Sequence, residues 1–84
     1  MKIKKSVAIS ESGYIFNPST GDSFTVNPMG VEIFNLLKEE KSYEDISKVI
    51  LEKFNTDEDT FEKDYNDFIA MLNLHLLIDN GNEK

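Results

Sequence analysis

The sequence contains few residues that could perform catalysis or bind a metal. His75 is the single histidine and there is no cysteine, so thiolate nucleophiles, thiolate metal sites and disulfides are all excluded. A Ser-His-Asp triad would need a serine paired with His75, and no motif marks one. His75 and Asp79 could contact one cation, but two ligands do not complete a metal site. The sequence therefore predicts no catalytic residue, no metal and no cofactor.

The sequence also lacks the residue spacing of two other ligand-binding motifs, a calcium-binding loop and a phosphate-binding loop. The acidic stretch 57–67 has the composition of a calcium-binding loop. However, Phe61 stands at a ligand position of an EF-hand loop, and Glu62 stands where that loop needs glycine. The four glycines are scattered at positions 13, 21, 30 and 81, so no glycine-rich loop is available to bind a phosphate.

Two classes of non-catalytic domain also fit the sequence poorly. The tripeptide Asp22-Ser23-Phe24 resembles the modification site of acyl and peptidyl carrier domains. Those domains carry the serine at the start of a helix, whereas Ser23 opens a strand-like segment. A winged-helix DNA reader fits the expected topology. Its recognition helix would begin with the acidic segment 57–64, and the chain has no arginine for bidentate contact with guanine.

Charge and composition restrict the partners further. The 84 residues carry nine lysines and sixteen acidic residues, a net charge of −7. This charge disfavours nucleic acid and anionic membranes and favours a neutral or basic partner. The length predicts a single domain over residues 1–84, with a core at about 6–78 and a polar tail at 79–84. Because cysteine, a signal peptide and a long apolar run are missing, we expect a cytoplasmic protein without a membrane partner.

The periodicity of the sequence changes near residue 27. Before it, three short segments rich in strand-forming residues occupy 6–10, 14–16 and 23–26. They are separated by turn-forming residues at 11–13 and 17–21. Three short strands joined by tight turns predict an antiparallel meander.

After residue 27 the apolar residues recur with helical spacing. Asn27, Ser42 and either Thr56 or Asp57 are the expected N-caps of three helices, the last of which runs to about residue 76. The expected buried stripes are Gly30, Ile33, Phe34 and Leu37; Ile46, Val49, Ile50 and Phe54; and Phe61, Tyr65, Phe68 and Leu72. The sequence thus predicts an α+β fold in which a three-stranded antiparallel sheet precedes three helices, in a winged-helix-like arrangement.

The expected last helix has an apolar face wider than a single stripe. Beside its main stripe runs a second one, formed by Asp64, Phe68, Met71 and His75. This width is typical either of a broad core face in a thin domain or of the wall of a groove that binds a peptide. Methionine and aromatic side chains adapt well to peptide ligands.

The segment 23–26 could provide the opposite wall if it lies at a sheet edge. An uncovered edge can accept an extended peptide as an additional strand. Four backbone hydrogen bonds contribute about 2–6 kcal/mol, which does not offset an association cost of about 4–15 kcal/mol. Side chains of the peptide must therefore enter the groove, and we expect Val26→Pro to weaken binding. The candidate peptide-binding residues are Ser23, Phe24, Thr25, Val26, Asp64, Phe68, Met71 and His75.

Several segments, in this order, resemble the PqqD family, named after coenzyme PQQ synthesis protein D. They are Asn17-Pro18-Ser19-Thr20-Gly21, Phe24-Thr25-Val26-Asn27-Pro28-Met29-Gly30, Ile33-Phe34-Asn35-Leu36-Leu37, Ser42-Tyr43-Glu44-Asp45-Ile46 and the Asp64, Phe68-Ile69, Leu72 pattern. The resemblance covers about residues 6–78. Phe34 stands where the family often has tryptophan, and His75 stands where glycine or a small polar residue is common.

The resemblance implies a non-catalytic peptide chaperone. In that family the leader segment of a ribosomally made precursor peptide adds as a strand beside the last sheet strand and next to the third helix. The domain then presents the precursor to a modifying enzyme, such as a radical SAM protein, a protease or a cyclase. The alternative is a winged-helix interaction adaptor or a transcription-related domain without a precursor peptide. Either a monomer or a strand-swapped dimer is compatible with the sequence.

Overall fold

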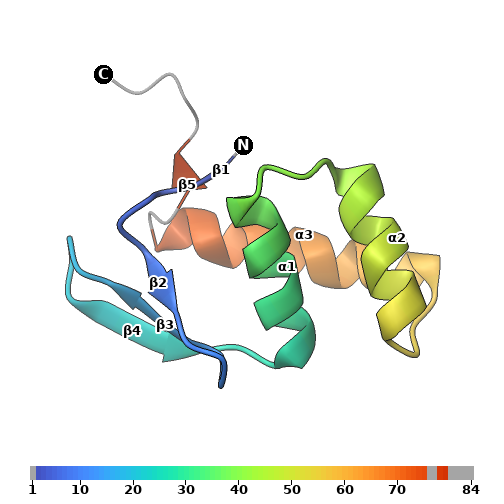
Figure 1. Ribbon diagram of the computed structural model, residues 1–84, viewed down its shortest axis with the longest axis horizontal. Helices are drawn as coiled ribbons and strands as arrows, with labels where there is room; N and C mark the ends of the chain where they lie inside the picture. The colour runs from blue at the N-terminus through green and yellow to red at the C-terminus, as the bar shows by residue number, and fades with distance from the viewer. Residues whose placement is uncertain (1, 76–77, 80–84) are drawn as a thin grey trace.

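The first third of the chain forms the expected three-stranded antiparallel sheet (Figure 1). The computed structural model describes residues 2–75 and 78–79. Strands β2 (Ala8–Ile9), β3 (Tyr14–Asn17) and β4 (Asp22–Thr25) lie in the order β2-β3-β4. Among the described strands β4 pairs with β3 alone, so it forms an edge of this sheet. The predicted meander is confirmed.

A glycine allows the turn before β3 to lie against the end of β4. Gly13 has a φ of 92°, in the left-handed region that favours glycine. The carbonyl oxygen of Gly13 accepts a hydrogen bond of 2.8 Å from the Val26 N–H. A Cβ atom at position 13 would collide with the carbonyl oxygen of Val26. Gly13 therefore fixes where β4 ends and the first helix can begin.

Three helices follow, and each begins at an expected cap. The helices are α1 (Pro28–Lys38), α2 (Tyr43–Lys53) and α3 (Glu58–Leu74). The side chains of Asn27, Ser42 and Asp57 each accept a hydrogen bond from the backbone N–H three residues later, at 2.8, 3.1 and 2.8 Å. Of the two caps considered for α3, the structure uses Asp57. This helix ends at Leu74 with His75 as its C-cap, and the expected end at residue 76 lies outside the described residues.

The core joins the inner face of the sheet to the facing stripes of all three helices. Its fully buried side chains include Ile15 from β3, Phe34 from α1 and Leu72 from α3. Most of the predicted stripe residues are buried. Three of them, Val49, Phe54 and Phe68, are half-buried.

A second sheet, not predicted from the sequence, joins the two ends of the described chain. Strand β1 (Lys2–Ile3) pairs antiparallel with β5 (Ile78–Asp79). Ile3 is 5% exposed and belongs to the core, so the core begins nearer the N-terminus than residue 6. Asp79, expected in the polar tail, has its backbone in β5, and residues 80–84 of that tail lie outside the described residues. None of the helices in the described part of the chain has the length and apolar character needed to span a bilayer.

Candidate functional site

The free side of β4 exposes backbone groups that could pair with another strand. Because the Val26 N–H bonds to Gly13, the backbone of Val26 faces the β3 side of the sheet. Backbone groups of successive residues in an antiparallel strand alternate in direction, so Phe24 also faces β3. The N–H and C=O groups of Ser23 and Thr25 must then point away from β3. These four groups define the β4 edge.

The side chains of β4 lie on two different faces of the sheet. The Tyr14 hydroxyl donates a hydrogen bond of 2.8 Å to Ser23 Oγ on the outer face. Phe24 and Val26 lie on the other face, half-buried and packed against the core. The four residues predicted from this segment therefore differ in what they could offer a ligand. Ser23 and Thr25 provide backbone groups, whereas Phe24 and Val26 provide apolar surface.

An aromatic stack connects β4 to the C-terminal end of α3. The Phe24 and His75 rings lie 4.7 Å apart between centroids, with an interplanar angle of 28°. His75 is held at this position as the C-cap of α3, where its N–H donates to the Met71 carbonyl at 3.1 Å. The structure thus brings a residue of the predicted strand into contact with a residue of the predicted helix stripe.

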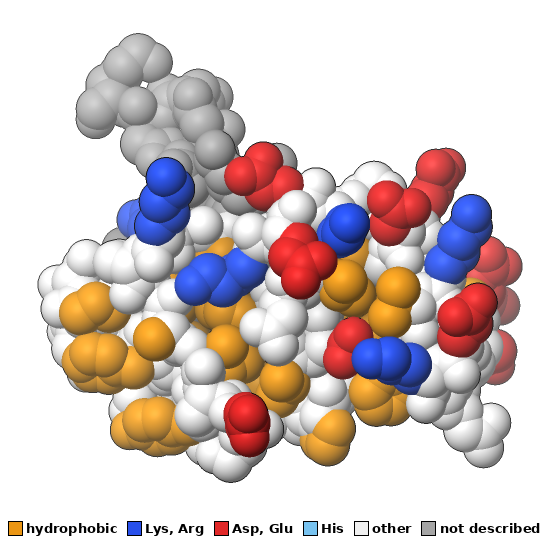
Figure 2. Space-filling model, in the orientation of Figure 1, with side chains coloured by type: hydrophobic (Ala, Val, Ile, Leu, Met, Phe, Trp, Pro, Cys, Tyr) orange, Lys and Arg blue, Asp and Glu red, His pale blue; other side chains and the backbone are white. Residues whose placement is uncertain are grey.

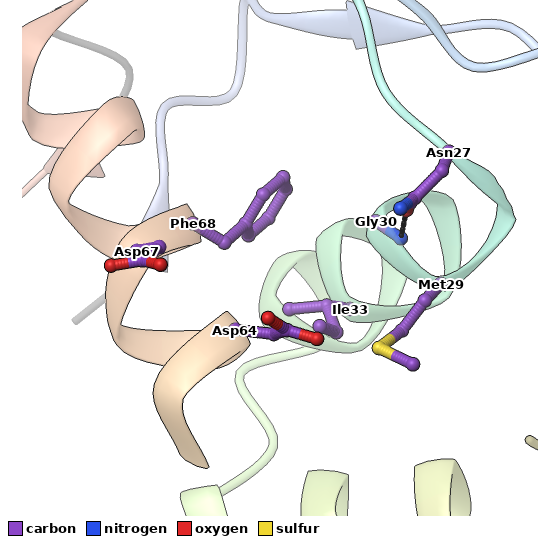
Figure 3. A pocket seen from close by; sticks show the side chains of 7 residues that line it. All are labelled: Asn27, Met29, Gly30, Ile33, Asp64, Asp67 and Phe68. Carbon is purple, nitrogen blue, oxygen red and sulfur yellow. Dashed lines mark hydrogen bonds between the residues drawn. The ribbon is translucent and has the colours of Figure 1, made fainter. Parts of the chain in front are cut away.

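A cavity of about 290 Å³ lies between the first turns of α1 and the middle of α3 (Figure 3). We refer to it as the α1–α3 cavity. Phe68 and Asp64 project from α3 toward α1, and Met29 and Ile33 line the α1 side (Figure 3). The complete lining is Asn27, Met29, Gly30, Ile33, Asp64, Asp67 and Phe68.

Gly30 places the α1–α3 cavity next to the end of β4. A Cβ atom at position 30 would lie 2.9 Å from Val26 Cβ, closer than side chains pack in folded proteins. The absence of this atom lets the Val26 side chain lie directly on the first turn of α1. The β4 edge and the cavity are therefore neighbouring parts of one surface, with Val26 between them.

The charged residues of the cavity are both acidic. Asp67 Oδ2 accepts a hydrogen bond of 3.1 Å from Lys63 Nζ, and this bond raises the pKa of Lys63 above its usual value. Asp64 forms no ion pair with any residue that the structure describes. The cavity therefore combines negative charge with the apolar side chains of Met29, Ile33 and Phe68.

Four of the eight predicted site residues form two pairs in the structure. Asp64 and Phe68 line the α1–α3 cavity, and Phe24 and His75 form the stack near the sheet. Met71 is half-buried and packs against the core. The wall that faces α3 across this cavity is α1, and the groove expected between the segment 23–26 and the last helix stays a prediction.

Sequence reasoning missed the contribution of α1 to this surface. The sequence pattern predicts a cap at Asn27 and a core position at Gly30, and it predicts no role for Met29. Asp67 was also missed, although it lies three residues after Asp64 and so on the same face of α3. The four-residue spacing of Met29 and Ile33 was the signal that one face of α1 could line a cavity.

A second cavity lies at the other end of the molecule. It has a volume of about 430 Å³ and is lined by residues of α2 together with Glu58 at the start of α3. None of the predicted site residues lines it. Figure 2 shows acidic side chains gathered at this end and hydrophobic side chains over the three-stranded sheet.

Two alternatives from the sequence can be compared with the structure. Ser23 lies within β4, so it does not occupy the helix start that a carrier domain requires. Within the residues that the structure describes, no group of three or more His, Cys, Asp or Glu side chains could hold a metal ion.

Comparisons with known proteins bear on the family and the fold of this chain. A search of curated proteins finds no match. The solved structure of TbiB1 in complex with the TbiA(beta) leader peptide aligns with a TM-score of 0.82 and 28% sequence identity, over 99% of this chain and 100% of that chain. The family model described as coenzyme PQQ synthesis protein D (PqqD) matches residues 13–78. This match covers well over half of the 84 residues, and the chain belongs to the PqqD family.

Proposed function

We propose that this protein binds the leader segment of a ribosomally made precursor peptide and presents the precursor to a modifying enzyme. The leader adds as a strand along the β4 edge, and its side chains enter the α1–α3 cavity. The observation that carries the proposal is the position of the outward backbone groups of Ser23 and Thr25 beside a cavity with apolar walls. Membership of the PqqD family and the likeness to TbiB1, solved with a leader peptide, support it.

The energetics require both parts of this surface. The outward groups of Ser23 and Thr25 can form up to four hydrogen bonds, which contribute about 2–6 kcal/mol. Binding of a separate peptide costs about 4–15 kcal/mol, because the peptide loses translational and rotational entropy. Each apolar side chain that becomes fully buried adds about 1.5–3 kcal/mol. The cavity therefore supplies the stabilisation that strand pairing lacks.

The proposed role is recognition without catalysis, in the cytoplasm where precursor peptides are synthesised. The chemistry belongs to the enzyme that receives the precursor, for which a radical SAM protein, a protease and a cyclase are the candidate classes. His75, the one histidine of the chain, stacks on Phe24, where it contributes a wall to the peptide surface.

Titration of the ¹⁵N-labelled protein with synthetic leader segments tests the proposal by NMR. The peptides are the TbiA(beta) leader and those encoded by short reading frames beside this gene. Binding should shift the amide signals of Ser23 and Thr25 and slow their exchange with solvent. The Val26 amide is already hydrogen-bonded to Gly13 and should change less. Binding that leaves the amides of Ser23 and Thr25 unchanged would contradict the proposed strand pairing.

A proline substitution gives a second readout. Thr25→Pro removes an outward N–H, and proline is tolerated on an edge strand at such a position. Loss of one hydrogen bond of about 0.5–1.5 kcal/mol should lower the affinity for the peptide about 2- to 12-fold. The matched control is Thr25→Val, which keeps the N–H and should retain the affinity. Equal affinities for the two variants would argue against an outward N–H at position 25.

A further inference from the structure

The α1–α3 cavity combines two kinds of side chain. Met29, Ile33 and Phe68 contribute apolar side chains, and Asp64 and Asp67 contribute carboxylates from α3 (Figure 3). The lining residues of α1 carry no charge. A purely apolar side chain would contact the apolar residues but would pair with neither carboxylate.

The protein itself compensates these carboxylates only weakly. Lys63 pairs with Asp67 at the surface, and the two side chains are 78% and 68% exposed. Exposed pairs of this kind contribute little to stability, and lysine preceding the acid is the less favourable order on a helix. Asp64 forms no ion pair within the described residues. A ligand cation could therefore bind beside these carboxylates without breaking a strong interaction.

We propose that the α1–α3 cavity selects a basic side chain, arginine or lysine, of the leader peptide. This inference rests on the proposed function and adds a sequence requirement to it. The aliphatic stem of such a side chain packs against the apolar side chains while its charged end remains in water. There it meets Asp64 and Asp67, and a guanidinium can form two parallel hydrogen bonds with a carboxylate.

The geometry also gives the position of this residue in the leader. The Phe24–His75 stack marks one end of the surface, and Phe68 and Asp64 precede His75 by seven and eleven residues on α3. A helix rises about 1.5 Å per residue, so these positions lie roughly 10 and 16 Å along its axis. An extended peptide covers about 3.3 Å per residue. The basic residue should lie about three to five residues from the peptide residue beside Phe24.

Two positional series of the TbiA(beta) leader peptide test this inference by calorimetry. In one series each residue in turn is replaced by arginine, and in the other by glutamate. At one position within the expected interval, arginine should bind about five-fold or more tightly than glutamate, as expected for an ion pair near the surface. This preference should decrease at high salt, because salt screens exposed charges.

Protein variants separate a local contact from the general negative charge. The double variant Asp64→Asn/Asp67→Asn should abolish the preference for arginine at that position. The control Glu58→Gln/Asp59→Asn removes the same number of charges in the first turn of α3, outside the cavity, and should retain most of the preference. Equal effects of the double variant and the control would overturn the inference, as would equal binding of arginine and glutamate throughout the interval.

The outcomes also distinguish this inference from the proposed function. Peptides that shift the amides of Ser23 and Thr25 but show no charge preference support leader binding and refute the basic-residue requirement. If no leader peptide binds and no amide shifts, the proposed function fails, and the requirement that rests on it fails as well.

Discussion

Proline should destabilise the fold at Val26 but leave its stability nearly unchanged at Thr25, and this difference can be measured without any ligand. The Val26 N–H donates to the Gly13 carbonyl at 2.8 Å, whereas the Thr25 N–H points away from β3. Val26→Pro removes a hydrogen bond within the protein's own sheet. Thr25→Pro removes an N–H that has no partner in the sheet. The expectation from the sequence that Val26→Pro weakens peptide binding stays a prediction, but its reason changes, because the N–H that proline removes is bonded within the protein.

The structure gives the size of the difference. Val26→Pro loses a hydrogen bond of about 0.5–1.5 kcal/mol and leaves the buried carbonyl of Gly13 unpaired, at a further cost of about 1–3 kcal/mol. We expect a total of about 1.5–4.5 kcal/mol. A chain of this length has a free energy of unfolding of roughly 4–13 kcal/mol, so over most of this range the variant still folds in water. Thr25→Pro should change the free energy of unfolding by less than about 1 kcal/mol, as an edge position tolerates proline.

Urea denaturation followed by far-ultraviolet circular dichroism measures both variants against the wild-type protein. The denaturant midpoint should fall clearly for Val26→Pro and remain nearly unchanged for Thr25→Pro. Thr25→Val and Val26→Ala separate the loss of the side chain from the loss of the N–H. Equal destabilisation by the two prolines, or a larger loss for Thr25→Pro, would refute the assigned direction of the backbone groups and with it the β4 edge.

Three further substitutions test the fold that supports this surface. Gly13→Ala should lower the free energy of unfolding by about 1–3 kcal/mol or more, measured by urea denaturation, because it strains a φ of 92° and collides with the Val26 carbonyl. Leu72→Ala should cost about 2–5 kcal/mol in the same assay, since Leu72 is fully buried. Asp57→Asn tests how the stability of the fold depends on pH. The hydrogen bond from the Thr60 N–H lowers the pKa of Asp57 below its ordinary value of 3.8. The carboxylate therefore stabilises the fold above that value and loses this effect as the pH falls through the lowered pKa. Asparagine caps a helix without titrating, so thermal unfolding should show a smaller loss of stability in acid for Asp57→Asn than for the wild-type protein.

The elements of the fold were predictable where the signal was local. The change of periodicity near residue 27 separated strands from helices, and Asn27, Ser42 and Asp57 marked the helix starts through side-chain chemistry that acts over three residues. Strands β1 and β5 were missed because they are defined by pairing between the two ends of the described chain. Unlike the equally short β2, neither is followed by a nearby partner strand and a tight turn that would mark it in the sequence.

The candidate site was likewise predictable only where its residues lie close together in the sequence. Asp64 and Phe68 share a face of α3 through helical spacing, so their proximity followed from the sequence. That Met29 and Ile33 of α1 face them across a cavity depends on how the two helices pack, which no local pattern specifies. The contact between Phe24 and His75, 51 positions apart in the sequence, depends on the packing of α3 against the sheet.

The sequence by itself determined the class of this protein: an acidic α+β domain without cysteine, with a meander, three capped helices and the motif order of the PqqD family. These properties depend on composition and on interactions between residues close in the chain. Only the tertiary structure decided which backbone groups of β4 face outward, and that α1 completes the cavity with α3. Both depend on long-range packing, in which Gly13 and Gly30 matter because they lack a side chain. The space that a missing Cβ leaves for a neighbour is visible only when that neighbour is in place.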